Sequence, residues 1–193
     1  MDAIHRVRWE RSELLRVISG SARGRKLKEP GGLVIRPTSA VVKEAVFNII
    51  QFDIEGRRAL DLFAGTGQLG IEALSRGAAS AVFVDSDLAA VKLIRENIKL
   101  CGVESAAAVY NRDALKYLER KESFDLIFID PPYDSVLAGI ALRKIIEFDK
   151  LNSNGIIICE TRAGSILPED SPPYFMQKEY KYGSVKITRY ERG

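Results

Sequence analysis

The sequence predicts an α/β protein with a mainly parallel, doubly wound sheet and an antiparallel C-terminal hairpin. Three observations lead to this class. From residue 58 onward, short apolar runs alternate with segments whose apolar residues recur at helical spacing. A glycine-rich turn joins the first apolar run to the first of these helices. The last two apolar segments instead flank Gly183-Ser184, which is typical of a hairpin turn.

Seven strands and four helices are expected in this part of the chain. The strands are predicted at 59–63, 81–84, 106–110, 124–129, 155–159, 175–182 and 185–190. The helices are predicted at 67–76, 88–100, 114–120 and 136–148. Gly77 and Gly102 come just after the first two helices, as glycine commonly does at helix ends. This regular alternation gives each pair of parallel strands its crossover helix.

The segment before the sheet is expected to form a small hairpin and one helix. Two short strands, 16–20 and 25–28, flank a turn at 21–24, and Pro30-Gly31-Gly32 breaks the pattern. Apolar residues at 42, 45, 46, 49 and 50 then predict a helix, with Thr38 or Ser39 as its N-cap. We therefore divide the chain into an extension at 1–15 that is a candidate for disorder, a hairpin and leading helix at 16–53, and a main domain at 54–193.

Composition limits the class of protein. The chain has 193 residues, of which 46% are hydrophobic and 28% charged, which suits one well-buried core. It has no apolar run of membrane-spanning length, and its N-terminus lacks a signal-peptide core, so we expect a cytoplasmic protein. Its two cysteines and its single histidine belong to no metal-binding spacing, so no transition-metal site is expected.

Charge is unevenly distributed along the chain. Residues 1–43 contain ten Lys and Arg against four Asp and Glu, a net charge of +6, while the whole chain carries only +3. A basic arm on a slightly acidic body favours an anionic polymer as partner, and nucleic acid first among them. A solvated basic hairpin is the alternative. The basic and polar residues expected to contact RNA are Arg23, Arg25, Lys26, Lys28, Arg36 and Thr38.

The glycine-rich turn predicts a nucleotide-binding loop. Gly65, Gly67 and Gly70 match G-x-G-x-x-G between a strand and a helix. Asp85 ends the next strand, where a carboxylate can accept hydrogen bonds from both hydroxyls of a ribose. The glycine-rich turn and Asp85 together indicate an adenosine-containing cofactor.

Two further acids favour S-adenosylmethionine over a dinucleotide. Asp61 lies four residues before the first glycine, where it can bind an ammonium group but would repel a pyrophosphate. Asp113 follows the third strand and could accept a hydrogen bond from the adenine amine, although a helix N-cap is an equally good interpretation. The complete set of cofactor-binding candidates is Asp61, Phe63, Ala64, Gly65, Thr66, Gly67, Asp85, Ser86, Asp113 and Ala114.

The sequence Asp130-Pro131-Pro132-Tyr133 is the candidate catalytic motif. It follows the apolar run 124–129, and its prolines end that strand because proline has no N–H for the sheet ladder. Asp130 and Tyr133 are thereby expected at the carboxyl end of a strand, where open α/β sheets bind ligands.

Together these motifs resemble the class I S-adenosylmethionine-dependent methyltransferases, a Rossmann-like class. The Asp-Pro-Pro-Tyr form is similar to that of enzymes that methylate exocyclic amines of nucleobases. The segments 16–27, 36–38 and 43–48, together with 60–70 and 72–78, resemble the bacterial family that methylates N2 of a guanine in 16S ribosomal RNA. The resemblance covers about residues 16–190, so residues 1–15 precede it.

The resemblance implies roles for the motif residues. Asp130 and the backbone carbonyl of Pro131 would accept N–H groups of the target amine, and Tyr133 would stack on an extruded base. The implied partner is 16S ribosomal RNA, within an assembling small subunit, and we expect the protein to act as a monomer.

Three other functions remain open at this stage. A DNA adenine-N6 methyltransferase would share the Asp130–Tyr133 motif, but no inserted target-recognition domain is evident. A nicotinamide-dependent oxidoreductase would use the glycine-rich loop and leave that motif unexplained. A non-catalytic RNA-binding module would have no need of Asp61, Asp85 and Asp130.

Overall fold

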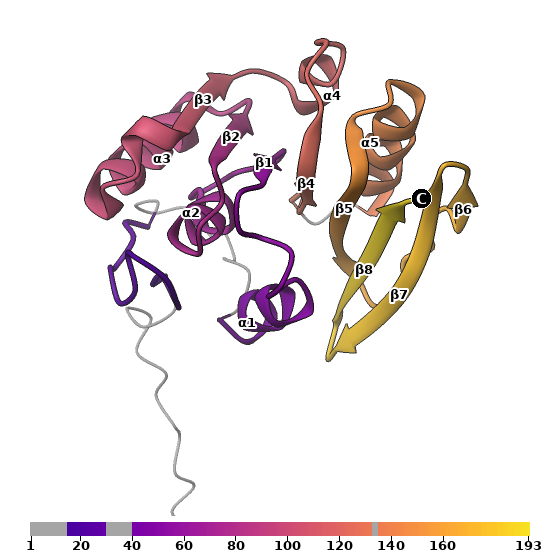
Figure 1. Ribbon diagram of the computed structural model, residues 1–193, viewed down its shortest axis with the longest axis horizontal. Helices are drawn as coiled ribbons and strands as arrows, with labels where there is room; N and C mark the ends of the chain where they lie inside the picture. Colours follow the sequence, from indigo (N-terminus) through magenta and orange to yellow (C-terminus); the bar gives the residue numbers. More distant parts are fainter. Residues whose placement is uncertain (1–14, 30–39, 133–134) are drawn as a thin grey trace, which may run out of the picture.

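A single mixed sheet forms the centre of the molecule (Figure 1). The computed structural model describes residues 15–29, 40–132 and 135–193. The candidate residues Arg36, Thr38, Ser39 and Tyr133, and the extension up to residue 14, lie outside these ranges.

The sheet has the order β3-β2-β1-β4-β5-β8-β7-β6. Its strands are β1 (Arg58–Asp61), β2 (Ser80–Asp85), β3 (Ala107–Asn111), β4 (Phe124–Ile129), β5 (Leu151–Arg162), β6 (Asp170–Ser171), β7 (Tyr174–Tyr182) and β8 (Val185–Arg192). The first five pair in parallel, while β8 pairs antiparallel with β5 and with β7. The predicted parallel sheet with an antiparallel C-terminal hairpin is confirmed, and the two-residue β6 adds an eighth strand too short to leave a periodic signal.

Helices cover both faces of the sheet. They are α1 (Ala40–Ile49), α2 (Gln68–Ser75), α3 (Leu88–Cys101), α4 (Ala114–Tyr117) and α5 (Ser135–Glu147), with a short 3-10 helix, η2 (Glu104–Ala106). One apolar core joins α1, α2 and α3 to the sheet, and a second joins α4 and α5 to its other face. The helix predicted at 114–120 is shorter than expected, because α4 ends at Tyr117.

The two cores explain why the strands read as continuous apolar runs. In β4, Leu126 and Phe128 pack in the α1–α3 core, whereas Ile127 and Ile129 pack in the α4–α5 core. Both faces of a central parallel strand are buried, so alternation of apolar with polar residues is lost. The same alternation of faces determines toward which side of the sheet a polar side chain at the carboxyl end of a strand points.

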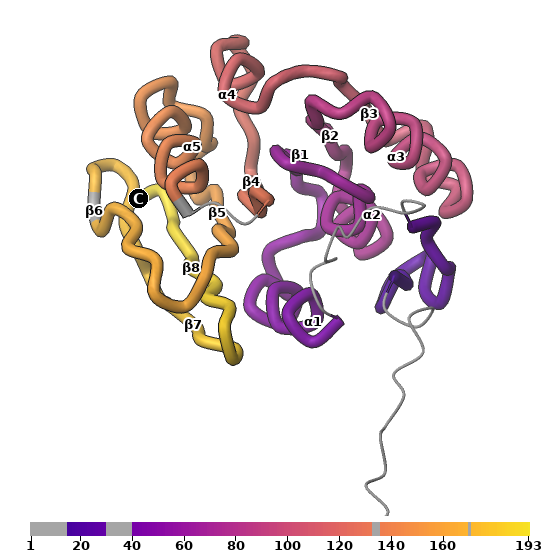
Figure 2. Tube along the Cα trace, turned by 180° about the vertical axis from the view of Figure 1, so that it is seen from behind, coloured from indigo at the N-terminus to yellow at the C-terminus, as the bar shows by residue number. Residues whose placement is uncertain are grey.

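The basic segment 15–29, here termed the basic loop, is a compact loop with a single antiparallel bridge between Arg16 and Lys26. The prediction of two short strands was therefore wrong, although the chain does double back. Backbone hydrogen bonds from Val17 N to Arg25 O (3.0 Å) and from Leu27 N to Leu15 O (2.8 Å) close the loop. Leu15 is buried, so the packed chain begins inside the predicted extension. Figure 2 shows the basic loop, in indigo, beside α2 and α3.

Within the residues described, no helix is long and apolar enough to cross a membrane.

Candidate functional site

Four carboxylates lie in a row at the carboxyl ends of the adjacent strands β2, β1, β4 and β5. They are Asp85, Asp61, Asp130 and Glu160. Asp61 is level with Phe83 of β2 and Phe128 of β4, so Asp85 and Asp130 each lie two residues further along on either side. Parallel strands bring their carboxyl ends to one edge of a sheet, and the alternation of faces points all four toward the α1–α3 side. We term this set the carboxylate row; Glu160 is its one member that was not predicted.

Asp61 is the most deeply buried of the first three carboxylates. Only 2% of it is exposed, and its Oδ2 accepts a hydrogen bond of 3.0 Å from the N–H of Gly70. Burial raises the pKa of Asp61 from 3.8 to about 7, and the negative charges of Asp130 and Asp85 add to this effect. The hydrogen bond from Gly70 acts in the opposite direction. A buried carboxylate beside two others is therefore a place where a cation would be stabilised.

Asp85 fastens the glycine-rich loop to the end of β2. Its Oδ2 accepts from Gly65 N at 2.8 Å, and its Oδ1 accepts from Asp87 N at 2.9 Å. Asn111 was missed by the sequence analysis: its side-chain amide donates to Ser86 O at 2.9 Å and to Asp85 O at 3.2 Å. Its only sequence signal was its position at the end of the third strand. The contact of Asp85 with a ribose stays a prediction.

The glycine-rich loop adopts a conformation that requires glycine. Gly65 and Gly67 have φ angles of 54° and 78°, in the left-handed region that other residues rarely adopt. A Cβ on Gly70 would lie 2.3 Å from Phe83, so the third glycine allows α2 to pack closely on β2. Ala64 and Thr66 are buried beside these glycines, and Phe63 is half-buried.

Asp113 caps α4. Its Oδ1 accepts a hydrogen bond of 2.9 Å from Lys116 N, and Ala114 follows it as the first, buried residue of the helix. The capping interpretation is thus confirmed. The additional contact of Asp113 with adenine stays a prediction, and the side chain is exposed at this edge of the sheet.

Asp130, Pro131 and Pro132 of the candidate catalytic motif lie directly after β4, as expected. The strand ends at Ile129, and Asp130 is half-buried directly after it. Pro131 is buried and Pro132 is exposed. The motif therefore begins inside the carboxylate row and leaves the sheet at once.

The basic loop is anchored on α2 by buried polar groups that the sequence analysis missed. Glu72 is fully buried, and its two oxygens accept from Ile18 N (2.7 Å) and Ser19 N (2.9 Å). Two cations compensate its charge: Arg76 Nε at 2.8 Å and Lys43 Nζ at 3.6 Å. Burial lowers the pKa of Lys43, and Glu72 opposes that shift. Because Ile18 and Ser19 lie 54 and 53 positions from Glu72 in sequence, no local pattern predicts the anchor.

Asn97 of α3 connects the basic loop to the glycine-rich loop. Its Oδ1 accepts from Lys28 N at 2.7 Å, while its Nδ2 donates to Lys28 O at 3.2 Å and to Thr66 O at 2.9 Å. The side chain is fully buried. One amide thus fixes the end of the basic loop relative to the candidate cofactor site.

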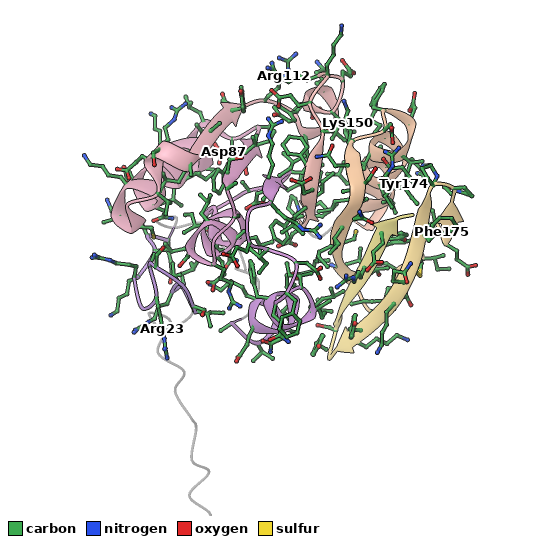
Figure 3. All side chains as sticks on the ribbon, in the orientation of Figure 1. Arg23, Asp87, Arg112, Lys150, Tyr174 and Phe175 are labelled. Carbon is green, nitrogen blue, oxygen red and sulfur yellow. The ribbon has the colours of Figure 1, made fainter. Side chains whose placement is uncertain are left out.

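The basic side chains of this loop point outward. Arg23, Arg25 and Lys26 are exposed, and Figure 3 shows Arg23 extending from the edge of the molecule. Lys28 is also exposed but forms an ion pair of 2.8 Å with Glu96, which would compete with a phosphate. A hollow of about 370 Å³ between the basic loop and α1 is lined by Arg16, Arg23 and Lys43, among others. The surface therefore offers both charge and concavity to an anionic chain.

The residues present fit S-adenosylmethionine. Its ammonium group matches the buried, hard-to-ionise Asp61, and its ribose hydroxyls match a carboxylate at the end of β2. Gly65 and Gly67 carry no side chains, so a ligand can approach the backbone of the loop between β1 and α2 closely. In the part of the chain described, no group of three or more His, Cys, Asp or Glu could hold a metal ion.

The sheet is doubly wound, its last hairpin is antiparallel, a glycine-rich loop follows β1, and acids lie at the carboxyl ends of β1, β2 and β4. This combination defines the class I methyltransferase fold. Comparison with known proteins agrees. The chain belongs to the family described as Conserved hypothetical protein 95, whose model matches residues 15–191.

Its relatives are named as methyltransferases. The chain is 40% identical to YlbH of Bacillus subtilis, which is provisionally named as an rRNA methyltransferase, over 92% of this chain and 99% of that protein. It is 32% identical to ribosomal RNA small subunit methyltransferase D of Escherichia coli, covering 92% and 90% of the two chains. The solved structure of yhhF from Escherichia coli, provisionally named as a methyltransferase, superimposes with a TM-score of 0.83 at 30% identity, covering 93% of this chain and 98% of that one.

Proposed function

We propose that this protein transfers a methyl group from S-adenosylmethionine to the exocyclic N2 of a guanine in 16S ribosomal RNA. The observation that carries the proposal is the carboxylate row: an acid suited to a cation on β1 lies next to the acid of an Asp-Pro-Pro motif on β4. Methylation of ribosomal RNA is supported by the names of relatives that match over nearly their whole length. The choice of N2 and of guanine rests on the motif resemblance and on the chemistry below.

The amine at N2 of guanine is a poor nucleophile because its lone pair is delocalised into the ring. S-adenosylmethionine supplies an electrophilic methyl group on a sulfonium. The protein must therefore position the amine for attack and provide a negative charge that stabilises the positive charge developing on the nitrogen.

Asp130 contributes both. Its carboxylate accepts an N–H of the target amine, so that the nitrogen lone pair is oriented for in-line attack. As attack proceeds, the nitrogen becomes positively charged and the carboxylate stabilises it. The surplus proton of the methylated amine then passes to Asp130 or to water. The carbonyl of Pro131 accepts the second N–H; Tyr133 stacks on the base.

The basic loop binds the RNA backbone. Arg23, Arg25 and Lys26 are free of the ion pair that holds Lys28, and they contact phosphates without reading bases. Since the loop is anchored on α2 and α3, it holds RNA at a constant distance from the glycine-rich loop.

The decisive experiment supplies purified protein with methyl-labelled S-adenosylmethionine and one of three substrates: naked 16S RNA, small ribosomal subunits that lack base methylation, or unmethylated DNA. The modified nucleoside is identified by mass. We expect N2-methylguanosine from subunits or from RNA. N6-methyladenine from DNA would overturn the proposal in favour of a DNA methyltransferase, and absence of transfer to all three would refute it.

A further inference from the structure

Glu160 is the member of the carboxylate row that the mechanism above does not use. It follows Cys159, which pairs with Ile129 of β4, so Glu160 lies beside Asp130 at the same level of the sheet. The neighbouring strand β8 places Ile187 opposite it on the other side. Adjacent strands are about 4.8 Å apart, so the side chains of Glu160 and Asp130 can reach neighbouring atoms of one ligand.

Among the residues that the structure describes, one oxygen of Glu160 lacks the partner that a buried acceptor needs. Its Oε2 is buried and makes no hydrogen bond to any of the residues described. Buried carboxylates elsewhere in this protein are satisfied: Glu72 by two backbone N–H groups and two cations, Asp61 by Gly70. An acceptor that stays unsatisfied at a candidate active site indicates a donor brought by the substrate.

We propose that Glu160 recognises the target base by accepting a hydrogen bond from N1–H of guanine, while Asp130 accepts one from the N2 amine. This inference rests on the proposed function. Guanine presents N1–H and the N2 amine as neighbouring donors, which match two neighbouring carboxylates. Adenine has an acceptor at N1, which would face the carboxylate and be repelled. Glu160 is therefore a specificity-determining residue.

The electrostatic interaction between Glu160 and Asp130 agrees with this role. Burial, and then the charge of Asp130, raise the pKa of Glu160 to about 8. Two like charges in this position are unfavourable without a ligand. A base that brings two donors, and whose N2 becomes positive during the reaction, stabilises both carboxylates at once.

The test uses a base analogue. Once the methylated guanine is mapped, small subunits are reconstituted with guanine or with 2-aminopurine at that position. 2-Aminopurine keeps the N2 amine but has an acceptor at N1. At about pH 9, above the pKa of Glu160, its carboxylate is ionised and can only accept a hydrogen bond. At this pH we expect the wild-type protein to prefer guanine over 2-aminopurine by about 100-fold or more in kcat/KM, as sites built to bind a donor do. In E160Q the amide can donate to N1 of 2-aminopurine, so the preference should shrink at least about tenfold, in part through faster methylation of the analogue.

The controls separate this inference from the proposed function. E147Q, an exposed change on α5, should keep the wild-type preference. E160Q should bind S-adenosylmethionine as the wild type does. If the wild-type protein forms N2-methylguanosine but shows no preference for guanine over 2-aminopurine, or if E160Q keeps the full preference, the role of Glu160 is refuted and the proposed function stands. If no N2-methylguanosine is formed at all, both fall.

Discussion

Asp61 is a carboxylate whose charge opposes folding when no cation is bound. Its pKa in the folded protein is about 7, compared with 3.8 for the unperturbed group. The native state therefore retains a proton that the unfolded chain loses, and the free energy of unfolding falls as the pH rises from about 4 to 7. We expect D61N, which can still accept from Gly70, to be more stable than the wild type at pH 8 by up to about 4 kcal/mol, and equally stable at pH 4.

Urea unfolding of the cofactor-free protein between pH 4 and pH 8 measures this difference. D87N, an exposed N-cap where asparagine caps equally well, serves as the matched control. The same D61N change should weaken S-adenosylmethionine binding. A variant that is less stable than the wild type at pH 8 would show that the charge of Asp61 is compensated within the protein.

Asp130 is expected to act on the reaction and not on cofactor binding. D130A removes the acceptor for the target amine while Asp61 and Asp85 remain in place. We expect kcat to fall by about 100-fold or more, the loss typical of removing one electrostatic contact to a transition state. The dissociation constant of S-adenosylmethionine, measured by calorimetry, should change less than about threefold. Turnover close to that of the wild type would exclude the assigned role.

Single residues differ in how far the sequence predicts them. Asp61 was found because it precedes the glycine-rich loop, Asp85 because it ends the next predicted strand, and Asp130 because two prolines follow it. Glu160 follows the apolar run predicted as a strand at 155–159, but no motif accompanies it. Asn97 and Glu72 were missed because their partners, such as Lys28 and Ile18, lie far away in sequence.

At the scale of elements, the basic loop is expected to control RNA affinity through charge. Reversal of Arg23 and Arg25 to glutamate should weaken binding to 16S RNA by about tenfold or more at low salt and flatten the dependence of log Kd on log salt. Filter binding at several salt concentrations measures both. R143E, an exposed reversal on α5, is the control. Unchanged affinity and salt dependence would mean that the loop is an ordinary solvated surface.

The attachment of the basic loop to α2 depends on Glu72. In E72Q, two backbone N–H groups compete for one amide oxygen, and Lys43 is left buried without a counter-charge. Breaking one partner of a buried ion pair costs about 3–5 kcal/mol, so we expect a loss of that order in the free energy of unfolding. K43M combined with E72Q should recover part of it. Denaturant unfolding of E72Q, K43M and the double variant measures the coupling energy between Glu72 and Lys43. If the effects of the two single changes simply add, the two side chains are not coupled and this prediction is contradicted.

The elements themselves were predicted better than the loop. Residues 124–129 form β4 with the predicted bounds, because a buried parallel strand is a continuous apolar run that prolines end. The basic loop was predicted as two strands because its residues favour extended backbone. Its actual shape is set by tertiary contacts: a Cβ on Gly20 would lie 1.7 Å from Ser75 O, which accepts from Ser21 N at 2.8 Å.

For the whole molecule, the carboxylate row makes stability depend on the cofactor. S-adenosylmethionine brings a cation to acids that burial and mutual repulsion destabilise, and it binds only the folded chain. At a free concentration 100 times the dissociation constant, it should add about 2.7 kcal/mol to the free energy of unfolding. For a chain of this size that corresponds to a rise in Tm of about 5–11 °C.

Thermal unfolding of the wild type and D85A, with and without S-adenosylmethionine, tests this dependence. D85A loses the candidate ribose contact and also releases Gly65 N, which Asp85 holds at 2.8 Å, so its rise in Tm at the same cofactor concentration should be largely lost. D113N is the matched comparison, because asparagine keeps both the cap of α4 and an acceptor oxygen, and its rise in Tm should equal that of the wild type. A full rise in D85A would show that the carboxylate of Asp85 neither contacts the cofactor nor orders the loop that receives it, and the row would then reduce to Asp61, Asp130 and Glu160.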